Sequence, residues 1–132
     1  PPGSDYLFIA ADDVTNPLRR GSFKLQQAQA IARFVESHNA ASRLFVCCDG
    51  GVSRSAAVAA AIMYASTGND EAFWLNSSFR PNPLVYSLTR EALGFPCEEN
   101  SLQVKIARNE DALKRKIESR RQRSSNTDNT NI

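Results

Sequence analysis

The sequence is poor in the residues that hold disulfide-rich and zinc-binding proteins together. Its 132 residues include only three cysteines and one histidine, His38. The odd cysteine count excludes a disulfide framework, and the absence of a CxxC pair argues against a structural zinc site. The adjacent Cys47 and Cys48 would form only a strained disulfide. We therefore expect reduced thiols, as in the cytoplasm or the nucleus.

Long apolar segments and a strong charge of one sign are also missing. The longest apolar run, the alanine-rich residues 56–65, is far shorter than the roughly 20 residues that span a bilayer. Residues 1–5 show no signal-peptide pattern. Sixteen basic and 14 acidic residues leave a net charge of +2, which is too small to indicate a nucleic-acid partner, and none is expected. Hydrophobic residues make up 42% of the chain, as in one ordinary globular domain.

The order of the predicted elements indicates the fold. Short apolar runs at residues 6–11 and 44–47 predict buried strands. Apolar residues at helical spacing predict helices over about 23–37 and 101–121. Loop, proline and glycine signals predict further helices over about 54–66 and 84–93, and a short one is expected at 70–75. Ser22 is the expected N-cap of the first helix, and Gly68 is expected to end the second. Strands alternating with helices predict an α/β fold with a parallel-rich central sheet flanked by helices.

The same pattern predicts one domain and a tail. We expect a single domain over residues 1–123, which includes a basic C-terminal helix at about 101–121. Residues 96–132 carry eight basic and six acidic side chains, whereas the preceding part is neutral. The Ser-, Thr- and Asn-rich residues 124–132 are expected to form a disordered tail.

The segment most suggestive of chemistry follows the second predicted strand and opens a predicted helix. Its residues are Cys48, Asp49, Gly50, Gly51, Val52, Ser53, Arg54 and Ser55. Backbone N–H groups of residues 49–54 in such a glycine-containing loop converge on one point, where the helix N-terminus adds positive charge. Arg54 adds a planar set of donors. The loop therefore predicts a site for a tetrahedral dianion.

A cysteine at the start of that loop gains a chemical role from its surroundings. The same dipoles stabilise the thiolate of Cys48. A thiolate beneath a bound phosphate is a nucleophile directed at phosphorus. Ser55 can donate a hydrogen bond to the sulfur and so help it leave in a second step. The competing interpretation is a glycine-rich turn with an inert buried cysteine.

Residues Cys48 to Ser55 resemble the signature loop of the cysteine-dependent protein tyrosine and dual-specificity phosphatases, which reads cysteine, five residues, arginine, then serine or threonine. The resemblance extends from residue 6 to about residue 93 and implies a small single-domain member with a phosphatase-like fold. It implies hydrolysis of phosphotyrosine in a phosphorylated protein, with phosphoserine and phosphothreonine as further substrates. It implies no metal and no cofactor, because Arg54 and backbone amides carry the phosphate charge.

One position departs from the family pattern. Cys47 stands where the family has histidine, and a thiol organises the hydrogen bonds of the loop poorly. The resemblance therefore implies a less rigid loop and a less acidic Cys48. Cys47 is read as a small buried side chain, with a redox partner of Cys48 as the alternative.

The resemblance also implies an aspartate, about thirty residues before the cysteine, that acts first as general acid and then as general base. Asp12 and Asp13 follow the first predicted strand. Adjacent side chains on an extended segment point in opposite directions, so one of the two faces the pocket. Asp13 is the preferred acid and Asp12 is the alternative. A third interpretation is that both only cap the start of a loop.

Two further features and two competing functions stay open. Residues 80–83 are similar to the family segment whose asparagine, here Asn82, supports the phosphate loop, although a plain proline turn fits equally. The basic C-terminal helix is a candidate for docking on an acidic partner, and a solvated helix face is the alternative. The competing functions are an inactive or weakly active domain that binds phosphopeptides, favoured by the missing histidine, and a sulfurtransferase, disfavoured by Arg54 and Ser55. The oligomeric state is left open.

Overall fold

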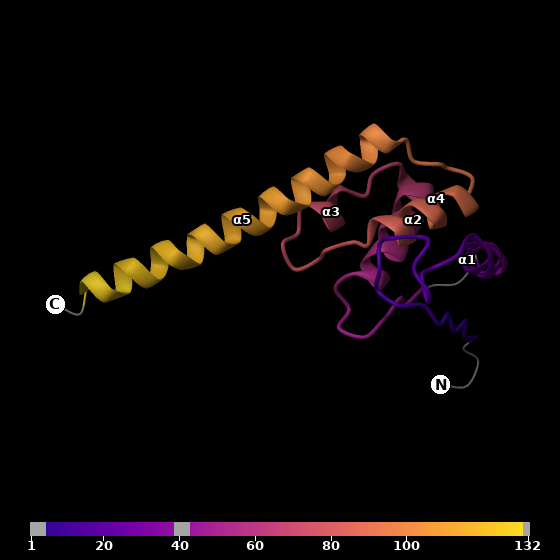
Figure 1. The fold of residues 1–132 in the computed structure, drawn as a ribbon, viewed down its shortest axis with the longest axis horizontal. Helices are drawn as coiled ribbons and strands as arrows, with labels where there is room; N and C mark the ends of the chain where they lie inside the picture. The colour runs from indigo at the N-terminus through magenta and orange to yellow at the C-terminus, as the bar shows by residue number, and fades with distance from the viewer. Residues whose placement is uncertain (1–4, 39–42, 131–132) are drawn as a thin grey trace.

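The computed structural model describes residues 5–38 and 43–130. Figure 1 labels the five helices in these ranges: α1 (Leu25–Ser37), α2 (Arg54–Thr67), α3 (Glu71–Trp74), α4 (Pro83–Ala92) and α5 (Glu99–Thr130). The five predicted helices are therefore confirmed. The bounds of the first four lie within two residues of the expected ones.

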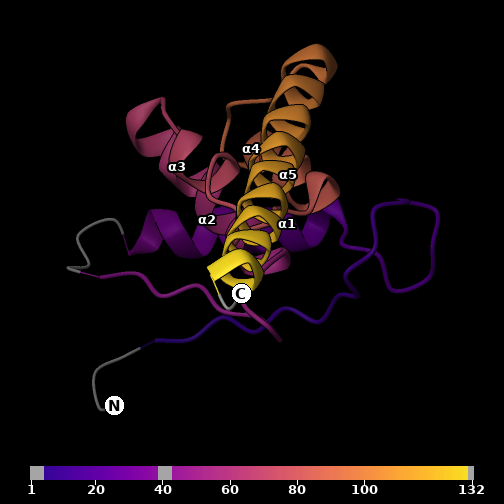
Figure 2. The same cartoon turned by 90° about the vertical axis from the view of Figure 1, so that its left-hand side faces the viewer.

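The predicted α/β fold with a parallel-rich central sheet is wrong, because the described residues form an all-helical domain without a strand. Residues 6–11 and 44–47, the two expected strands, are extended and pass below α1 in Figure 2. A strand exists only where its backbone hydrogen-bonds to a neighbouring strand. Within residues 5–38 and 43–130, no backbone hydrogen bond joins the two segments, so they form no sheet.

The two extended segments nevertheless keep the side-chain alternation of strands. Ile9 and Ala11 pack against the core, whereas Tyr6 and Phe8 are 78% and 87% exposed. In the second segment Phe45 is 81% exposed. Successive side chains on extended backbone point to opposite faces. The prediction of two buried strands is therefore wrong, because the segments do not pair and Tyr6, Phe8 and Phe45 are exposed.

Local hydrogen bonds set the ends of the helices. The N-cap of α1 is Lys24, whose N–H donates to the Gln27 side chain at 2.9 Å, and not the expected Ser22. The Ser22 hydroxyl instead donates to the Pro17 carbonyl at 3.0 Å. Gly68 ends α2 as predicted, with a left-handed φ of 77° that glycine adopts without strain.

Helix α4 lies at the centre of the fold and packs against α1 and α2. From α2, the small side chains of Ala57, Ala60 and Ala61 are fully buried, which lets α4 approach closely. Trp74 of α3 is 2% exposed and packs edge-on against Tyr86 of α4, with ring centroids 5.0 Å apart. These side chains make one contiguous core.

A buried carboxylate ties α3, α4 and α5 together. Asp70 is 1% exposed and accepts hydrogen bonds from the Tyr86 hydroxyl, from Trp74 Nε1 at 3.1 Å and from Lys105 Nζ at 2.8 Å. Burial alone would raise the pKa of Asp70, but these donors outweigh burial and hold the pKa below its usual value. This network was not predicted from the sequence.

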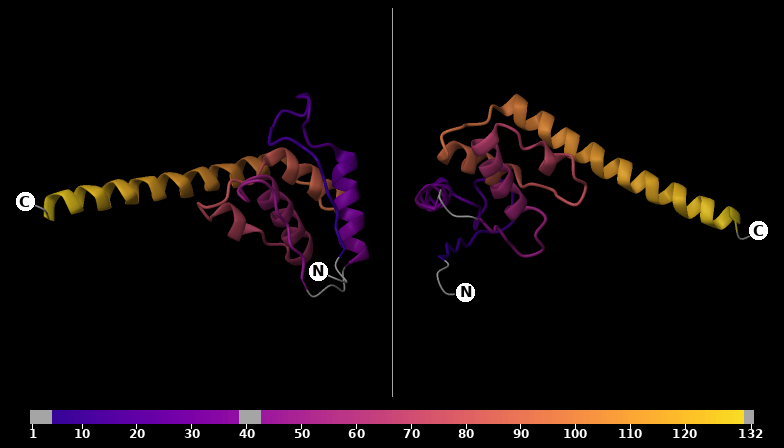
Figure 3. Two further views of the ribbon diagram at one scale, coloured as in Figure 1. Left: turned by 90° about the horizontal axis from the view of Figure 1, so that it is seen from below. Right: turned by 180° about the vertical axis from the view of Figure 1, so that it is seen from behind.

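Helix α5 has two different halves. Its first half rests on α3 and α4, where buried Asn109 donates from Nδ2 to the carbonyls of Trp74 and Phe79 at 2.9 and 2.8 Å. Its second half projects away from the other helices (Figures 1 and 3). The helix continues to Thr130, past its expected end near residue 121. The division into a domain over residues 1–123 and a tail over 124–132 stays a prediction.

Among the residues described, no helix combines the length and the apolar character needed to cross a membrane.

Candidate functional site

The loop of residues 48–55, here named the Cys48 loop, leads from an extended segment into α2. Gly50 and Gly51 have φ values of 83° and 62°, a left-handed backbone that favours glycine. The Gly51 N–H donates to the Cys48 carbonyl at 3.2 Å. This turn brings Ser55, in the first turn of α2, to the sulfur. The Ser55 hydroxyl and Cys48 Sγ are hydrogen-bonded at 3.2 Å, and the Ser55 N–H donates to Sγ at 3.3 Å.

The surroundings of the Cys48 thiol favour its ionised form. Burial on its own would raise the pKa of Cys48. Hydrogen bonds from the hydroxyl and N–H of Ser55 and from the Gly51 N–H, together with the charge of Arg54, outweigh burial and lower the pKa of Cys48 below its usual value. The thiolate is therefore more populated near neutral pH than in an ordinary cysteine.

Arg54 has an incomplete set of hydrogen bonds. Its Nη1 donates to the Ala11 carbonyl at 2.9 Å, which ties the Cys48 loop to the segment that carries Asp12 and Asp13. Its Nε is buried and has no hydrogen-bond partner among the described residues. A buried N–H without an acceptor is unfavourable, so a bound ligand that supplies an acceptor would stabilise this arrangement.

Asp13 lies against the Cys48 loop. Its Oδ1 accepts hydrogen bonds from the Ser53 hydroxyl and from Asn82 Nδ2, both at 2.8 Å. Asn82 is 2% exposed and caps α4, since its Oδ1 accepts from the N–H groups of Leu84 and Val85 at 3.0 and 3.2 Å. One buried side chain therefore fixes both the start of α4 and the position of the carboxylate.

The backbone on either side of Asn82 also holds the Cys48 loop. The Arg80 N–H donates to the Val52 carbonyl at 2.9 Å, and the Asn82 N–H donates to the Ser53 carbonyl at 3.1 Å. The segment of residues 80–83 is thus more than a proline turn. The sequence offered Asn82 as a support for the loop but gave no sign of the contact between Ser53 and Asp13.

The two aspartates occupy different places. The Asp12 N–H donates to the Gly21 carbonyl at 2.8 Å, and the Asp12 carboxylate lies over Gly21, where it would clash with an added Cβ. Asp12 therefore closes the loop of residues 12–21, whereas Asp13 reaches the Cys48 loop. The assignment of either as general acid stays a prediction, and this geometry favours Asp13.

The other loop residues lie at the surface, next to open space. Asp49, Gly50, Gly51 and Val52 are exposed, and Ser53 is half-buried. Asp49, Val52 and Ser53 line a cavity of about 470 Å³ that extends to Asp13 and Asn82. Cys47 is exposed rather than buried, and all three cysteines are free thiols. Across residues 5–38 and 43–130, no three His, Cys, Asp or Glu side chains are placed to hold a metal ion.

Comparisons with known proteins assign no family. No protein-family model, curated protein or solved structure matches the chain. The implied membership of the cysteine-dependent protein tyrosine and dual-specificity phosphatases is therefore corrected, because the described residues form a small all-helical domain without the sheet that the family fold requires. A function has to be argued from the Cys48 loop itself.

Proposed function

We propose that this protein hydrolyses phosphate monoesters in phosphorylated proteins, with phosphotyrosine as the main substrate and phosphoserine and phosphothreonine as further ones. The observation that carries the proposal is the Cys48 thiol, which has a lowered pKa, two donors from Ser55 and the guanidinium of Arg54 beside it. The partnerless Nε of Arg54 supports the proposal, since a phosphate oxygen supplies the missing acceptor. The adjoining cavity supports it because it has room for the organic group of a phosphoester.

The first step forms a covalent intermediate. The Cys48 thiolate attacks phosphorus, and the bond between phosphorus and the ester oxygen breaks. Protonated Asp13 gives its proton to the departing oxygen, which leaves as the tyrosine, serine or threonine hydroxyl. Arg54 and the N–H groups of residues 49–54 stabilise the negative charge on the other phosphate oxygens. The products are the free hydroxyl group, cysteinyl-phosphate and an ionised Asp13.

The second step releases phosphate. The Asp13 carboxylate takes a proton from water while the water oxygen attacks phosphorus, and the bond between phosphorus and Cys48 Sγ breaks. The Ser55 hydroxyl, 3.2 Å from the sulfur, donates a hydrogen bond to the thiolate as it leaves. Inorganic phosphate departs, and Asp13 is again protonated. The proposed cycle uses no metal and no cofactor.

We place the protein in the cytoplasm or the nucleus, where its three free cysteines stay reduced. An acidic protein that docks on the projecting half of α5 is a separate proposal. It is supported by six basic residues within positions 114–123, against one acidic residue in the same stretch, Glu118. The basic residues are Lys114, Arg115, Lys116, Arg120, Arg121 and Arg123.

Hydrolysis of p-nitrophenyl phosphate and of a phosphotyrosyl peptide tests the proposed reaction. Wild type is expected to turn over both substrates, with and without EDTA. Cys48→Ser is expected to be inactive, whereas the matched control Cys97→Ser keeps wild-type activity. Acid-quenched Asp13→Asn is expected to carry one phosphoryl group on the peptide that contains Cys48, as detected by mass spectrometry.

Three other outcomes would contradict the proposed hydrolysis. Binding of the phosphotyrosyl peptide without turnover by wild type would replace the hydrolase with a phosphopeptide-binding domain. Consumption of thiosulfate in place of phosphoesters would indicate a sulfurtransferase. A wild-type protein that neither binds nor hydrolyses the peptide would overturn the proposal.

A further inference from the structure

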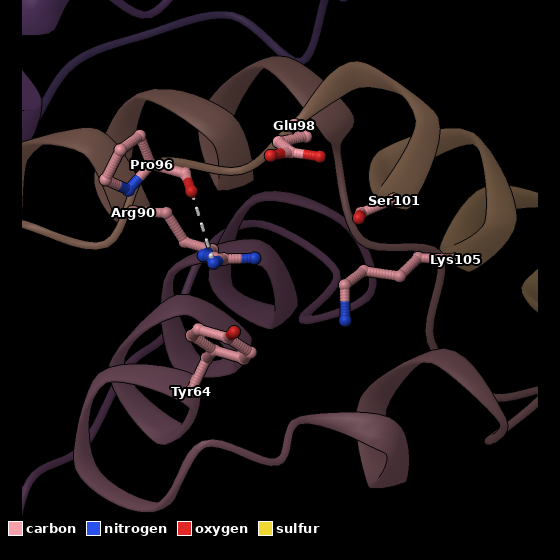
Figure 4. Close-up of a pocket in the computed structure, with 6 residues that line it drawn as sticks. All are labelled: Tyr64, Arg90, Pro96, Glu98, Ser101 and Lys105. Atoms are coloured by element: carbon pink, nitrogen blue, oxygen red, sulfur yellow. Dashed lines mark hydrogen bonds between the residues drawn. The ribbon is translucent and has the colours of Figure 1, made fainter.

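A second polar cavity, shown in Figure 4, has no part in the proposed reaction. Its volume is about 390 Å³, and it is lined by Tyr64, Arg90, Pro96, Glu98, Ser101 and Lys105. These residues come from the last turns of α2 and α4, the segment that joins α4 to α5, and the start of α5. Tyr64 lies about 15 Å along α2 from Arg54, at 1.5 Å per residue. The cavity is therefore separate from the Cys48 loop.

Arg90 is a buried cation without an anion. It is 5% exposed, and its guanidinium lies 3.6 Å above the Tyr64 ring. Its hydrogen-bond acceptors are all neutral: the Phe95 carbonyl at 2.8 Å, the Tyr86 hydroxyl at 3.0 Å and the Pro96 carbonyl at 3.5 Å. No carboxylate of the described residues forms a salt bridge with it. Buried charges in proteins are normally paired, so this one lacks a counter-ion.

The cavity also holds donors that are not used. A guanidinium has five N–H groups, and one on each terminal nitrogen of Arg90 remains after these contacts. Figure 4 shows a terminal nitrogen of Arg90 pointing into the space between Ser101 and Lys105. Lys105 Nζ donates one hydrogen bond to Asp70 Oδ1, at 2.8 Å. Because Asp70 balances the charge of Lys105, the charge of Arg90 is the uncompensated one.

We propose that this cavity binds a small molecule through an oxyanion group, a carboxylate or a phosphate. The oxyanion pairs with Arg90, and Lys105 and the Ser101 hydroxyl complete its hydrogen bonds. Glu98, on the wall of the cavity, opposes ligands with more than one negative charge. A volume near 400 Å³ suits a small metabolite rather than a polymer. The inference does not depend on the proposed hydrolase, because the cavity shares no residue with the Cys48 loop.

NMR titration of the ¹⁵N-labelled full chain with inorganic phosphate and with acetate tests the inference. The readouts are the Nε–Hε signal of Arg90 and the backbone signals of residues 97–101. Signals of residues 49–54 report the Cys48 loop separately, so the two sites succeed or fail independently. Saturable shifts at the cavity with either probe support the proposal. The probe that gives them distinguishes a phosphate site from a carboxylate site.

Three variants make the titration specific. Ser101→Asp places a carboxylate beside Arg90 and is expected to weaken binding of either probe at least about tenfold. Ala107→Asp adds the same charge at an exposed position on α5 outside the cavity lining, and binding is expected to change less than about twofold. Glu98→Gln is expected to tighten binding of phosphate more than that of acetate. None of these substitutions removes a buried group, so the variants are expected to fold.

Thermal unfolding gives a second readout. Ser101→Asp is expected to unfold at a higher temperature than Ala107→Asp, because its carboxylate replaces the missing counter-ion. Wild-type cavity signals that do not move up to about 50 mM of either probe would overturn the inference. Equal weakening by Ser101→Asp and Ala107→Asp would overturn it too, since general repulsion would then explain the shifts.

Discussion

A cysteine and an arginine lie together at each end of α2, and the two thiols differ in their chemistry. Burial is the largest influence on the pKa of both Cys48 and Cys97 and raises each. At Cys97 the charges of Arg90 and Lys105 offset burial only in part, so the pKa of Cys97 stays raised. At Cys48 the hydrogen bonds from Ser55 reverse the shift. A nearby guanidinium is thus not enough to make a reactive thiolate, and donors aimed at the sulfur decide the outcome.

The two arginines differ in a related way. Arg90 makes hydrogen bonds through all three of its nitrogens to neighbouring carbonyl and hydroxyl groups and braces the end of α4. Arg54 makes one, to the Ala11 carbonyl, and keeps a buried Nε without a partner. Arg90 is thus tied to the fold by three hydrogen bonds in addition to carrying the charge of the second cavity, whereas Arg54 is tied to the fold by one.

The largest expected effect is the difference in activity loss when each arginine is replaced by lysine in turn. Arg54→Lys is expected to lower kcat/KM for p-nitrophenyl phosphate at least about a thousandfold, because lysine cannot present paired donors to phosphate. Its melting temperature should stay close to that of wild type. Arg90→Lys should keep most of the activity and melt about 10 °C lower, because its bonds to Phe95 and Pro96 are lost. A similar loss of activity in both variants would contradict the different roles expected of Arg54 and Arg90.

The next effect separates the two aspartates. Asp13→Asn is expected to lower kcat about a hundredfold or more, since asparagine cannot take the proton from the water that attacks cysteinyl-phosphate. Asp12→Asn should change kcat less than about threefold, because Asp12 lies over Gly21 and not against the Cys48 loop. Steady-state kinetics with p-nitrophenyl phosphate measure both. The reverse ranking would make Asp12 the acid.

A stability effect is expected at the buried carboxylate of Asp70. Asp70→Asn is expected to lower the free energy of unfolding by about 3–5 kcal/mol, because it leaves Lys105 without its buried partner. Since the folded-state pKa of Asp70 is below its ordinary value of 3.8, its contribution is full above that pH and is lost as the pH falls through the lowered pKa. Urea unfolding at pH 7 and at pH 3 measures both statements. A loss below about 1 kcal/mol at pH 7 would contradict them.

The smallest effect concerns the thiols directly. Iodoacetamide at pH 7 is expected to alkylate Cys48 about ten times faster than Cys97. Mass spectrometry of the two cysteine-containing peptides measures both alkylation rates. The midpoint of the pH profile should lie lower for Cys48 than for Cys97, in line with the opposite directions of their pKa shifts. Ser55→Ala should move the Cys48 midpoint upward, and Ser87→Ala serves as the control. Identical pH profiles of alkylation for Cys48 and Cys97 would contradict the expected difference between the pKa values of the two thiols.

Helices were predictable here because their signals are local. Apolar spacing, the proline at the start of α4 and the glycine at the end of α2 all lie within a few residues of the structure they determine. A sheet depends on pairing between distant segments. The apolar run of residues 6–11 predicted a buried strand, but nothing in that run states whether a neighbouring strand exists.

The candidate site shows the same limit. Cys48, Arg54 and Ser55 share one loop, so their spacing alone placed them together. The hydrogen bond between Asp13 and Asn82 joins residues far apart in the chain, and the sequence did not predict it. The buried partnership of Asp70 with Lys105 left no local sign, because one precedes a short helix and the other belongs to a basic run.

The double role of Asn82 has a consequence for how the molecule assembles. Its Nδ2 donates to Asp13 while its Oδ1 accepts from the first turn of α4. During synthesis Cys48 emerges well before Asn82, the residue that holds Asp13. Under the proposed mechanism, a nascent chain that ends before α4 would therefore lack the support that keeps its proton donor in place.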